Sequence, residues 1–387
     1  MLKVFLNKGE EQRILEGHPW VFSNEIKGFD GEIKAGSICD VYSYNERYIG
    51  RGFFNSNSKI MVRILSHSQE DIDKEFFRKR ILKANDFRRS MGLDDNYRVV
   101  FSESDGIPGL IVDKYGEYLS IQIMCLGLEN FKQDIIDILV EIFKPKGIYE
   151  RSDVPVRKKE GLEEFKGVIY GEVPELIKIK ENDIYLYVDV INGQKTGYFL
   201  DQKMNRYALK NYAKNRTVLD CFSHTGGFAL NAASFGAKEV VAVDISEKAC
   251  NDIRRNASLN GFDNVKAICY DVFDYLRLEE NKDIFDLIVL DPPAFTKDKN
   301  SVEAAYRGYK DINLRALKII KSNGILFTFS CSQHMTPALF MEMLNEARID
   351  SKREVRLIDF KIQSPDHPTM LCGEETWYLK CAVLYIK

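Results

Sequence analysis

The chain has 387 residues and a formal net charge of −3, with 45% hydrophobic and 29% charged residues. This length predicts two or three domains, the composition excludes a disordered chain, and the small negative charge gives no overall sign of a nucleic-acid binder. No apolar run approaches the roughly 20 residues of a membrane span, and the charged start MLKVFLNKGEEQRILEG lacks a signal-peptide core. We therefore expect a cytoplasmic protein without a membrane segment.

The first 70 residues are rich in glycine and aromatic residues and contain short runs with alternating polarity. These runs are SICDVYSY, YIGRGFFN and KIMVRILS. Short alternating runs between turn residues are typical of a small β-barrel. We predict that residues 1–70 form one.

A long helix rich in basic residues is predicted to begin near residue 71. Its segment 74–89, KEFFRKRILKANDFRR, carries seven Lys and Arg residues. Such a segment is either an ordinary solvated surface or a site for phosphates of nucleic acid, and the sequence leaves both open. The candidates for phosphate contact are Arg78, Arg80 and Arg88.

Mixed helices and strands are predicted over the rest of residues 71–185, which we assign to a central α+β domain. Strands are expected at GLIVDKYG, YLSIQIMC, GIYERSD and IYLYVDVI, and a helix at NFKQDIIDILVEIF. The alternation of these elements gives no sign of an internal repeat.

From about residue 217 strands and helices alternate, within a predicted last domain of residues 186–387. The strands are TVLDCF, EVVAVDI, VKAICYD, FDLIVLD, GILFTFS and a final TWYLKCAVLYI. Alternation of this kind predicts an α/β fold, with an open, mostly parallel sheet and helices on both faces.

Polar residues that follow the strands predict a cofactor site, because ligands of such sheets bind at the carboxyl ends of the strands. Asp220, Gly226 and Gly227 follow the first strand, Asp244 the second and Asp271 the third. The G-x-G-x-x-G spacing of a dinucleotide site is absent. Carboxylates for a ribose and an adenine edge, without a pyrophosphate site, predict an adenosyl cofactor, and S-adenosylmethionine is the most common.

The fourth strand ends in DPPAF, which comprises Asp291, Pro292, Pro293, Ala294 and Phe295. Two prolines make a rigid extended turn, which is able to aim an acid and an aromatic ring at a flat base. The simpler interpretation is an ordinary strand exit. Next to a cofactor site, however, the turn favours methyl transfer to a planar base.

Cys331 follows the fifth strand and is expected at the same edge, next to Asp291. The eight cysteines include no C-x-x-C pair, so we expect neither a metal site nor disulfides. A thiol at this edge suits transfer to carbon, because thiolate addition to C6 of a pyrimidine makes C5 nucleophilic. We predict Cys331 as the nucleophile and Asp291 as the group that stabilises the adduct.

Several segments resemble the bacterial large-subunit (23S) ribosomal RNA cytosine-5 methyltransferase family. In chain order they are GHPWVFSNEI, NGQKTGYFLDQ, DCFSHTGGFAL, DPPAF, FSCS and DHP. The resemblance implies an N-terminal PUA-type RNA-binding barrel, a central α+β domain and a Rossmann-like class I methyltransferase domain. It implies large-subunit ribosomal RNA as the partner, and a cofactor wall made by Gln194, Tyr198, Phe199 and Asp201.

The predicted cofactor set also includes neighbours of the strand-end residues, namely Phe222, Ser223, Thr225, Ile245 and Val272. His367, in the DHP segment, is a candidate for contact with the base or part of a turn. Two alternatives stay open, a nitrogen-directed guanine methyltransferase and a non-catalytic RNA-binding protein. The methylated nucleotide, the base that removes the C5 proton and the choice between monomer and homodimer are also open.

Overall fold

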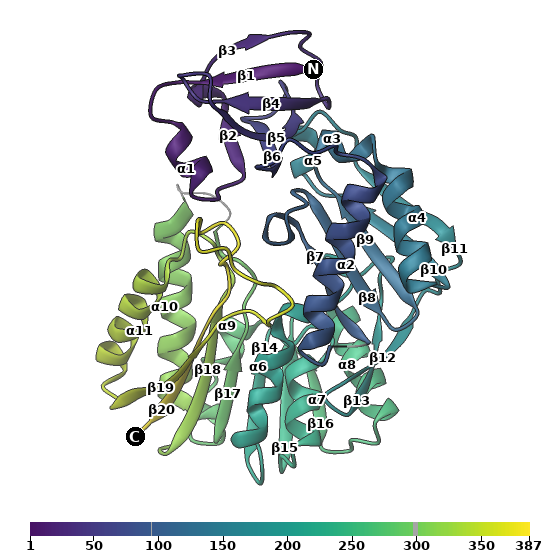
Figure 1. Ribbon diagram of the computed structural model, residues 1–387. Coiled ribbons are helices and arrows are strands. Elements are labelled where there is room, and N and C mark those ends of the chain that lie inside the picture. The colour runs from purple at the N-terminus through teal and green to yellow at the C-terminus, as the bar shows by residue number, and fades with distance from the viewer. Residues whose placement is uncertain (94, 297–300) are drawn as a thin grey trace. The chain divides into compact units, whose positions relative to one another are not determined.

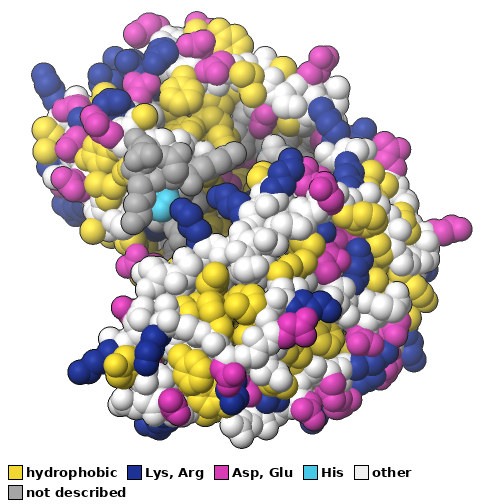
Figure 2. Space-filling model, turned by 90° about the horizontal axis from the view of Figure 1, so that it is seen from above, with side chains coloured by type: hydrophobic (Ala, Val, Ile, Leu, Met, Phe, Trp, Pro, Cys, Tyr) yellow, Lys and Arg dark blue, Asp and Glu magenta, His cyan; other side chains and the backbone are white. Residues whose placement is uncertain are grey.

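The computed structural model describes residues 1–93, 95–296 and 301–387, which include every predicted site residue (Figure 1). The chain forms two compact units. The first unit comprises Met1–Ile179, Val188–Leu200 and Pro365–Thr376, and the second comprises Lys180–Tyr187, Asp201–Ser364 and Trp377–Lys387. Acidic and basic side chains are intermixed over the face seen in Figure 2, in agreement with the small net charge.

The first unit begins with a six-stranded sheet in the order β2-β6-β5-β4-β1-β3. Strands β1 and β4 are parallel and the other pairs are antiparallel. Alternate residues of β1, namely Leu2, Val4 and Leu6, are buried in the core of this sheet. The elements are β1 (Leu2–Leu6), α1 (Glu11–Leu15), β2 (Trp20–Phe22), β3 (Ile26–Asp30), β4 (Ile38–Tyr42), β5 (Tyr48–Phe54) and β6 (Ile60–Ser66).

The predicted basic helix is confirmed as α2 (Lys74–Ser90). It begins after Asp73, whose side chain accepts a hydrogen bond of 2.9 Å from the amide of Phe76 and so caps the helix. Phe77 of α2 is buried in one apolar cluster with Phe53 of β5 and Ile121 of the next sheet. Helix α2 is therefore held on its inner side by the core of the first unit.

The second sheet of the first unit has the strand order β11-β10-β9-β8-β7. Strands β9 and β10 are parallel, and the other pairs are antiparallel. Its elements are β7 (Asn96–Phe101), β8 (Leu110–Tyr115), β9 (Tyr118–Ile123), α3 (Leu126–Glu129), α4 (Lys132–Phe143), β10 (Gly147–Ser152), α5 (Val156–Lys159) and β11 (Phe165–Gly171). A separate pair, β12 (Ile177–Glu181) and β13 (Ile184–Val188), follows.

The second unit contains a seven-stranded sheet in the order β16-β15-β14-β17-β18-β20-β19. Strand β20 is antiparallel to both neighbours, and the remaining pairs are parallel, as predicted for most of the sheet. The strands are β14 (Thr217–Cys221), β15 (Glu239–Asp244), β16 (Val265–Cys269), β17 (Leu287–Leu290), β18 (Gly324–Ser330), β19 (Val355–Lys361) and β20 (Lys380–Ile386).

Helices cover both faces of this sheet, which confirms the predicted α/β class. Leu219 and Ile288 face one apolar cluster, and their neighbours Val218 and Val289 face the other. This division follows from the two-residue period of a strand. The helices are α6 (Lys203–Ala208), α7 (Gly227–Ser234), α8 (Glu247–Leu259), α9 (Val272–Tyr275), α10 (Val302–Ile319) and α11 (Pro337–Ser351). Within the described ranges, helices lack the length and apolar character that a bilayer crossing requires.

Candidate active site

The turn after β14 has an unusual backbone. Phe222, His224 and Gly226 have φ angles of 61°, 53° and 86°, all in the left-handed region. Residues other than glycine rarely adopt this region of φ. Residues with a strained backbone of this kind cluster at functional sites. A Cβ atom on Gly226 would lie 3.3 Å from Ile253, so glycine suits this position in space as well as in φ. The turn leads directly into α7, which begins at Gly227.

Asp220, at the end of β14, has a fully buried carboxyl group. Its Oδ2 accepts hydrogen bonds from Ser223 Oγ and, at 3.0 Å, from the amide of Ala229. Its Oδ1 is buried without a donor in the part of the chain that the structure describes. Burial raises the pKa of Asp220 to about 7. A buried acceptor without a donor has room for a hydrogen bond from a bound ligand.

Asp244, at the end of β15, has a half-exposed carboxylate that is held by two backbone amides. Oδ2 accepts from His224 at 2.9 Å, and Oδ1 accepts from Ser246 at 2.9 Å. Each carboxylate oxygen keeps a lone pair for a further donor. Ile245 directly follows and is 68% exposed, which places apolar surface next to the acid.

Asp271 caps α9, because its Oδ1 accepts a hydrogen bond of 3.1 Å from the amide of Asp274. This is the simpler of the two roles that a strand-end Asp has, and contact with an adenine edge stays a prediction. Val272, the next residue, is buried. The carbonyl of Thr225, from the first turn, accepts a hydrogen bond of 3.0 Å from Asn256 of α8.

The residues of the predicted cofactor wall are divided between the two units. Gln194, Tyr198 and Phe199 belong to the first unit, and Asp201 belongs to the second. Tyr198 is buried, and Lys195 Nζ lies 4.4 Å from the centre of the Phe199 ring. Asp201 Oδ2 accepts a hydrogen bond of 2.6 Å from the Tyr378 hydroxyl. A common role of these four at a cofactor stays a prediction.

Cys331 and the DPPAF turn lie next to each other, as predicted. Strands β17 and β18 are parallel neighbours with Leu290 opposite Thr328, so both end at the same edge of the sheet. Cys331 is half-buried, and its Sγ lies 3.9 Å from the carbonyl oxygen of Pro292. Asp291 Oδ1 accepts a hydrogen bond of 2.9 Å from Gln202 Nε2.

The rest of the turn is partly engaged in packing. Pro292 is buried and Pro293 is exposed. The ring centre of Phe295 is 4.6 Å from that of Tyr309 and 6.0 Å from that of Phe273. The hydroxyl oxygen of Tyr309 also lies 2.9 Å from Ser332 Oγ, at hydrogen-bond distance. One face of the Phe295 ring therefore packs against other side chains of the protein.

Lys380, at the start of β20, is a buried cation close to Cys331. It lies opposite Ser330 in the antiparallel pair, and its Nζ donates to the carbonyl oxygens of Ser332 at 2.7 Å and Tyr378 at 2.8 Å. Burial lowers the pKa of Lys380 to about 8, although the charge of Cys331 acts in the opposite direction. Below that pH the ammonium favours the thiolate of Cys331.

Two residues beside the predicted site, Gln202 and Lys380, were not predicted from the sequence. Gln202 directly follows Asp201 in the segment NGQKTGYFLDQ, so its position was a usable signal. Lys380 carried no such signal, because its place depends on the register of β18 and β20.

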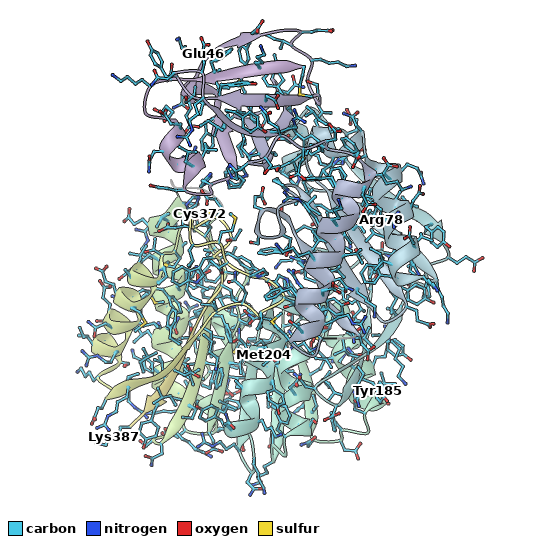
Figure 3. The ribbon with its side chains drawn as sticks, in the orientation of Figure 1. Glu46, Arg78, Tyr185, Met204, Cys372 and Lys387 are labelled. Atoms are coloured by element: carbon cyan, nitrogen blue, oxygen red, sulfur yellow. The ribbon has the colours of Figure 1, made fainter. Side chains whose placement is uncertain are left out.

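The three predicted phosphate-binding arginines are all engaged within the first unit. Arg78, which is labelled on α2 in Figure 3, forms ion pairs with Glu141 of α4 and, at 3.1 Å, with Glu75. The guanidinium of Arg80 donates to the carbonyl oxygens of Gly106 at 2.9 Å and Leu65 at 2.6 Å.

Arg88 is fully buried and makes two hydrogen bonds, of 2.5 and 2.8 Å, to the carboxylate of Asp105. A guanidinium without exposed surface has no access to a phosphate of RNA, so the prediction for Arg88 is wrong. His367 is also buried, with Nδ1 3.0 Å from Asp366 Oδ1. That arrangement agrees with a structural turn, and contact with the base stays a prediction.

Comparisons with known proteins identify the family. Residues 4–67 match the family described as PUA-like domain, and residues 163–370 match the family described as S-adenosylmethionine-dependent methyltransferase. A protein of Vibrio cholerae named ribosomal RNA large subunit methyltransferase I is 42% identical over 98% of this chain and 99% of the relative. Its namesake in Aeromonas salmonicida is 41% identical, with 98% of each chain covered.

Solved structures agree with the fold. A Streptococcus mutans protein matches 100% of both chains with a TM-score of 0.83 at 22% identity. A methyltransferase-type structure determined in complex with SAH has a TM-score of 0.86 at 23% identity, again over 100% of both chains. The family matches confirm the predicted PUA-type domain and the predicted cofactor. The chain belongs to the family of S-adenosylmethionine-dependent methyltransferases that includes the proteins named ribosomal RNA large subunit methyltransferase I.

Proposed function

We propose that this methyltransferase modifies C5 of a cytosine in large-subunit ribosomal RNA, with Cys331 as the nucleophile. The relatives' name supports ribosomal RNA as the substrate, and the PUA-like domain supports RNA binding. A substrate of this kind agrees with the expected cytoplasmic location. The observation that carries the choice of C5 is the thiol of Cys331, 3.9 Å from the Pro292 carbonyl oxygen of the DPPAF turn.

The cofactor residues in this proposal are Asp220, Asp244, Ile245 and the turn that ends in Gly226. Two observations fit S-adenosylmethionine. Among the described residues the buried Asp220 Oδ1 has no donor, and the cofactor's ammonium group would supply one. The half-exposed Asp244 carries acceptors for ribose hydroxyls beside the apolar surface of Ile245. When bound, S-adenosylmethionine supplies an electrophilic methyl group on sulfur.

The chemistry of C5 requires the thiol. C5 of cytosine is a weak nucleophile, but addition of the Cys331 thiolate to C6 breaks the C5–C6 double bond and makes C5 enamine-like. C5 then forms a bond to the methyl carbon, and the methyl–sulfur bond breaks. A base removes the proton from C5, the double bond forms again, and the Cys331 sulfur leaves C6. Transfer to an exocyclic nitrogen of guanine would need no thiol.

Asp291 and Lys380 assist this reaction in the proposal. Asp291 faces the base from the DPPAF turn, and the Gln202 amide orients its carboxyl group through a 2.9 Å hydrogen bond. The ammonium of Lys380 favours the thiolate form in which Cys331 attacks. Lys380 acts through Cys331 and is a positioning residue.

The test is a pair of cysteine variants assayed on protein-free large-subunit ribosomal RNA from a strain that lacks the gene. Cys331→Ala should bind S-adenosylmethionine normally and lose methyl transfer. Cys372→Ala should keep full activity, because Cys372 is a partly exposed thiol of the first unit and does not belong to the strand-end site. Mass spectrometry of nucleosides should show 5-methylcytidine with the wild type.

Substrate RNA that contains 5-fluorocytosine gives a second readout. Fluorine does not leave C5 as a proton does, so the wild type should form a covalent adduct that survives denaturing electrophoresis. The adduct should be absent with Cys331→Ala. If Cys331→Ala keeps its activity, or if the product is a methylated guanosine, the nitrogen-directed alternative replaces this proposal.

A further inference from the structure

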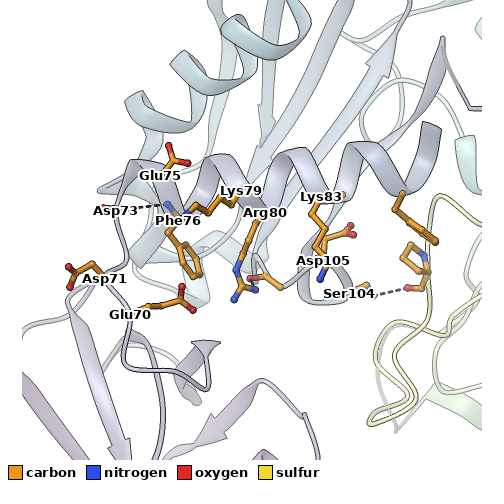
Figure 4. A pocket seen from close by; sticks show the side chains of 14 residues that line it. Glu70, Asp71, Asp73, Glu75, Phe76, Lys79, Arg80, Lys83, Ser104 and Asp105 are labelled. Atoms are coloured by element: carbon orange, nitrogen blue, oxygen red, sulfur yellow. Dashed lines mark hydrogen bonds between the residues drawn. The ribbon is translucent and has the colours of Figure 1, made fainter. Parts of the chain in front are cut away.

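The first unit contains a cavity of about 840 Å³ along helix α2 (Figure 4). Its lining comes from α2, from the segment that precedes the helix, from the turn 104–106 and from Pro368. This volume lies within the range of small-molecule sites and is large enough for a nucleotide. We propose that this cavity binds an unstacked nucleotide of the substrate RNA, with a phosphate at Lys79, Arg80 and Lys83 and the base at Phe87. The proposal rests on RNA as the substrate.

The wall of the cavity formed by α2 carries three cations, Lys79, Arg80 and Lys83. Within residues 1–93, 95–296 and 301–387, no ion pair joins Lys79, Arg80 or Lys83 to a carboxylate. Lys79 and Lys83 are exposed, and the guanidinium of Arg80 donates to two carbonyl oxygens, with Glu70 as the acid whose charge acts on it. Unpaired cations on one wall favour an anion, and a phosphodiester is the anion that RNA offers.

The acids of the cavity are already engaged. Asp71 pairs with Arg51, Glu75 with Arg78 and Asp105 with Arg88. Asp73 caps α2, and Glu70 accepts a hydrogen bond from Ser66. Four of the five acids lie at or before the first turn of α2, while the cations follow along the helix. The cavity is therefore acidic at one end and positively charged along the remainder of α2.

Aromatic rings flank the cations on the same face of α2. Phe76, Lys79, Arg80, Lys83 and Phe87 follow one another at intervals of one, three or four residues, which places them along one side of a helix. Figure 4 shows Phe76, Arg80 and Lys83 projecting from α2 on the cavity side. Phe87 is 43% exposed and offers a ring face to a base. Aromatic rings beside a basic track are typical of sites for single-stranded RNA.

The charge test compares two double variants in filter binding of a labelled single-stranded RNA of about ten nucleotides, within the usual site sizes. Lys79→Gln with Lys83→Gln should weaken binding on the order of tenfold at low salt and reduce the slope of log affinity against log salt by about 1.4, since two contacts are lost. Arg78→Gln with Arg89→Gln removes equal charge outside the cavity and should change affinity less than twofold. Equal losses in both pairs would mean general attraction to a basic helix and would overturn the site.

The aromatic test compares Phe87→Ala with Leu82→Ala. Leu82 is 38% exposed on the same helix but does not line the cavity. Phe87→Ala should weaken RNA binding by about fivefold or more, the range of one lost base stack, and Leu82→Ala should not. An unchanged affinity for Phe87→Ala would overturn the base contact. If uridine monophosphate binds as tightly as the RNA, the cavity is a site for free nucleotides.

Methyl-transfer kinetics separate this proposal from the proposed function. The lysine pair should raise the KM for ribosomal RNA while kcat and the affinity for S-adenosylmethionine stay unchanged, because neither lysine belongs to the strand-end site. A wild type that forms 5-methylcytidine while the lysine pair leaves KM unchanged overturns the cavity alone. A wild type that binds RNA through the cavity but forms another product overturns the cytosine proposal alone.

Discussion

The edge of the seven-stranded sheet and helix α2 carry two different kinds of proposed site. At the sheet edge, parallel strands end together, so the backbone itself brings Asp220, Asp244 and Cys331 to one side of the second unit. On α2, seven cations share one helix, and their roles depend on which acids happen to pair with them. The order and direction of the strands determine which residues meet at the first site. Ion pairing determines which cations remain available at the second.

The contrast shows how far the role of a charged residue can be inferred from its position in the sequence. Arg88 and Lys83 lie five residues apart on the same helix, yet one is buried against Asp105 and the other is exposed without an ion pair among the described residues. An excess of positive charge along a helix therefore predicts neither which residues stabilise the fold nor which contact RNA.

The largest effect is expected from Arg88→Met. Removal of this guanidinium leaves the Asp105 carboxylate buried without its partner, which should lower the free energy of unfolding by about 3–5 kcal/mol. Urea denaturation followed by circular dichroism measures this change in the free energy of unfolding. The matched control Arg89→Met is exposed on the same turn and should stay within about 0.5 kcal/mol of the wild type. If Arg88→Met lowers the free energy of unfolding no more than Arg89→Met does, paired and unpaired cations of α2 do not differ in their contribution to stability.

At the sheet edge, Asp244→Ala should weaken binding of S-adenosylmethionine by about 2–3 kcal/mol, because a charged acceptor of ribose hydroxyls is lost. Isothermal titration calorimetry on the folded variant measures this. The control is Glu239→Ala, at the opposite end of the same strand, which should bind as the wild type does. Equal affinity of both variants would remove Asp244 from the cofactor site.

The raised pKa of Asp220 predicts that both the stability of the protein and its affinity for S-adenosylmethionine depend on pH. Its pKa is raised on folding from 3.8 to about 7, so its contribution to stability is fully present below pH 3.8 and is lost as pH rises through 7. A ligand ammonium prefers the ionised carboxylate, so affinity for S-adenosylmethionine should rise with pH up to about 7. The slope should approach tenfold, about 1.4 kcal/mol, per pH unit.

The matched variant for this prediction is Asp220→Asn, which keeps the shape of the side chain but does not titrate. Its affinity should be weaker and nearly flat between pH 5 and 8. A wild type with pH-independent affinity would place the cofactor's ammonium elsewhere.

The smallest effect concerns Lys380→Met. Loss of the buried ammonium should move the midpoint of Cys331 alkylation upward by about one pH unit, because an adjacent cation favours the thiolate. Alkylation by iodoacetamide, followed by mass spectrometry of the peptide that contains Cys331, measures this. Lys361→Met, on the neighbouring strand β19, serves as the control and should leave the midpoint unchanged. A shift in both variants would point to a general change in the sheet.

Much of the sheet edge was predictable because alternation of strands and helices already implies parallel strands whose carboxyl ends meet. That rule correctly placed Cys331 beside the turn at Asp291. The position of Lys380 was not predictable, since it depends on β20 inserting antiparallel between β18 and β19. The burial of Arg88 was missed for a related reason, because its partner Asp105 lies outside the helix.

The buried ammonium next to Cys331 also has a consequence for redox chemistry. A thiolate reacts with peroxide far more readily than a thiol, and half-buried Cys331 keeps some access to solvent. Oxidation to a sulfenic acid would cap the sulfur and stop its addition to a base until a reductant restored it. In the proposed mechanism, the charge that favours the Cys331 thiolate therefore also makes methyl transfer dependent on reducing surroundings.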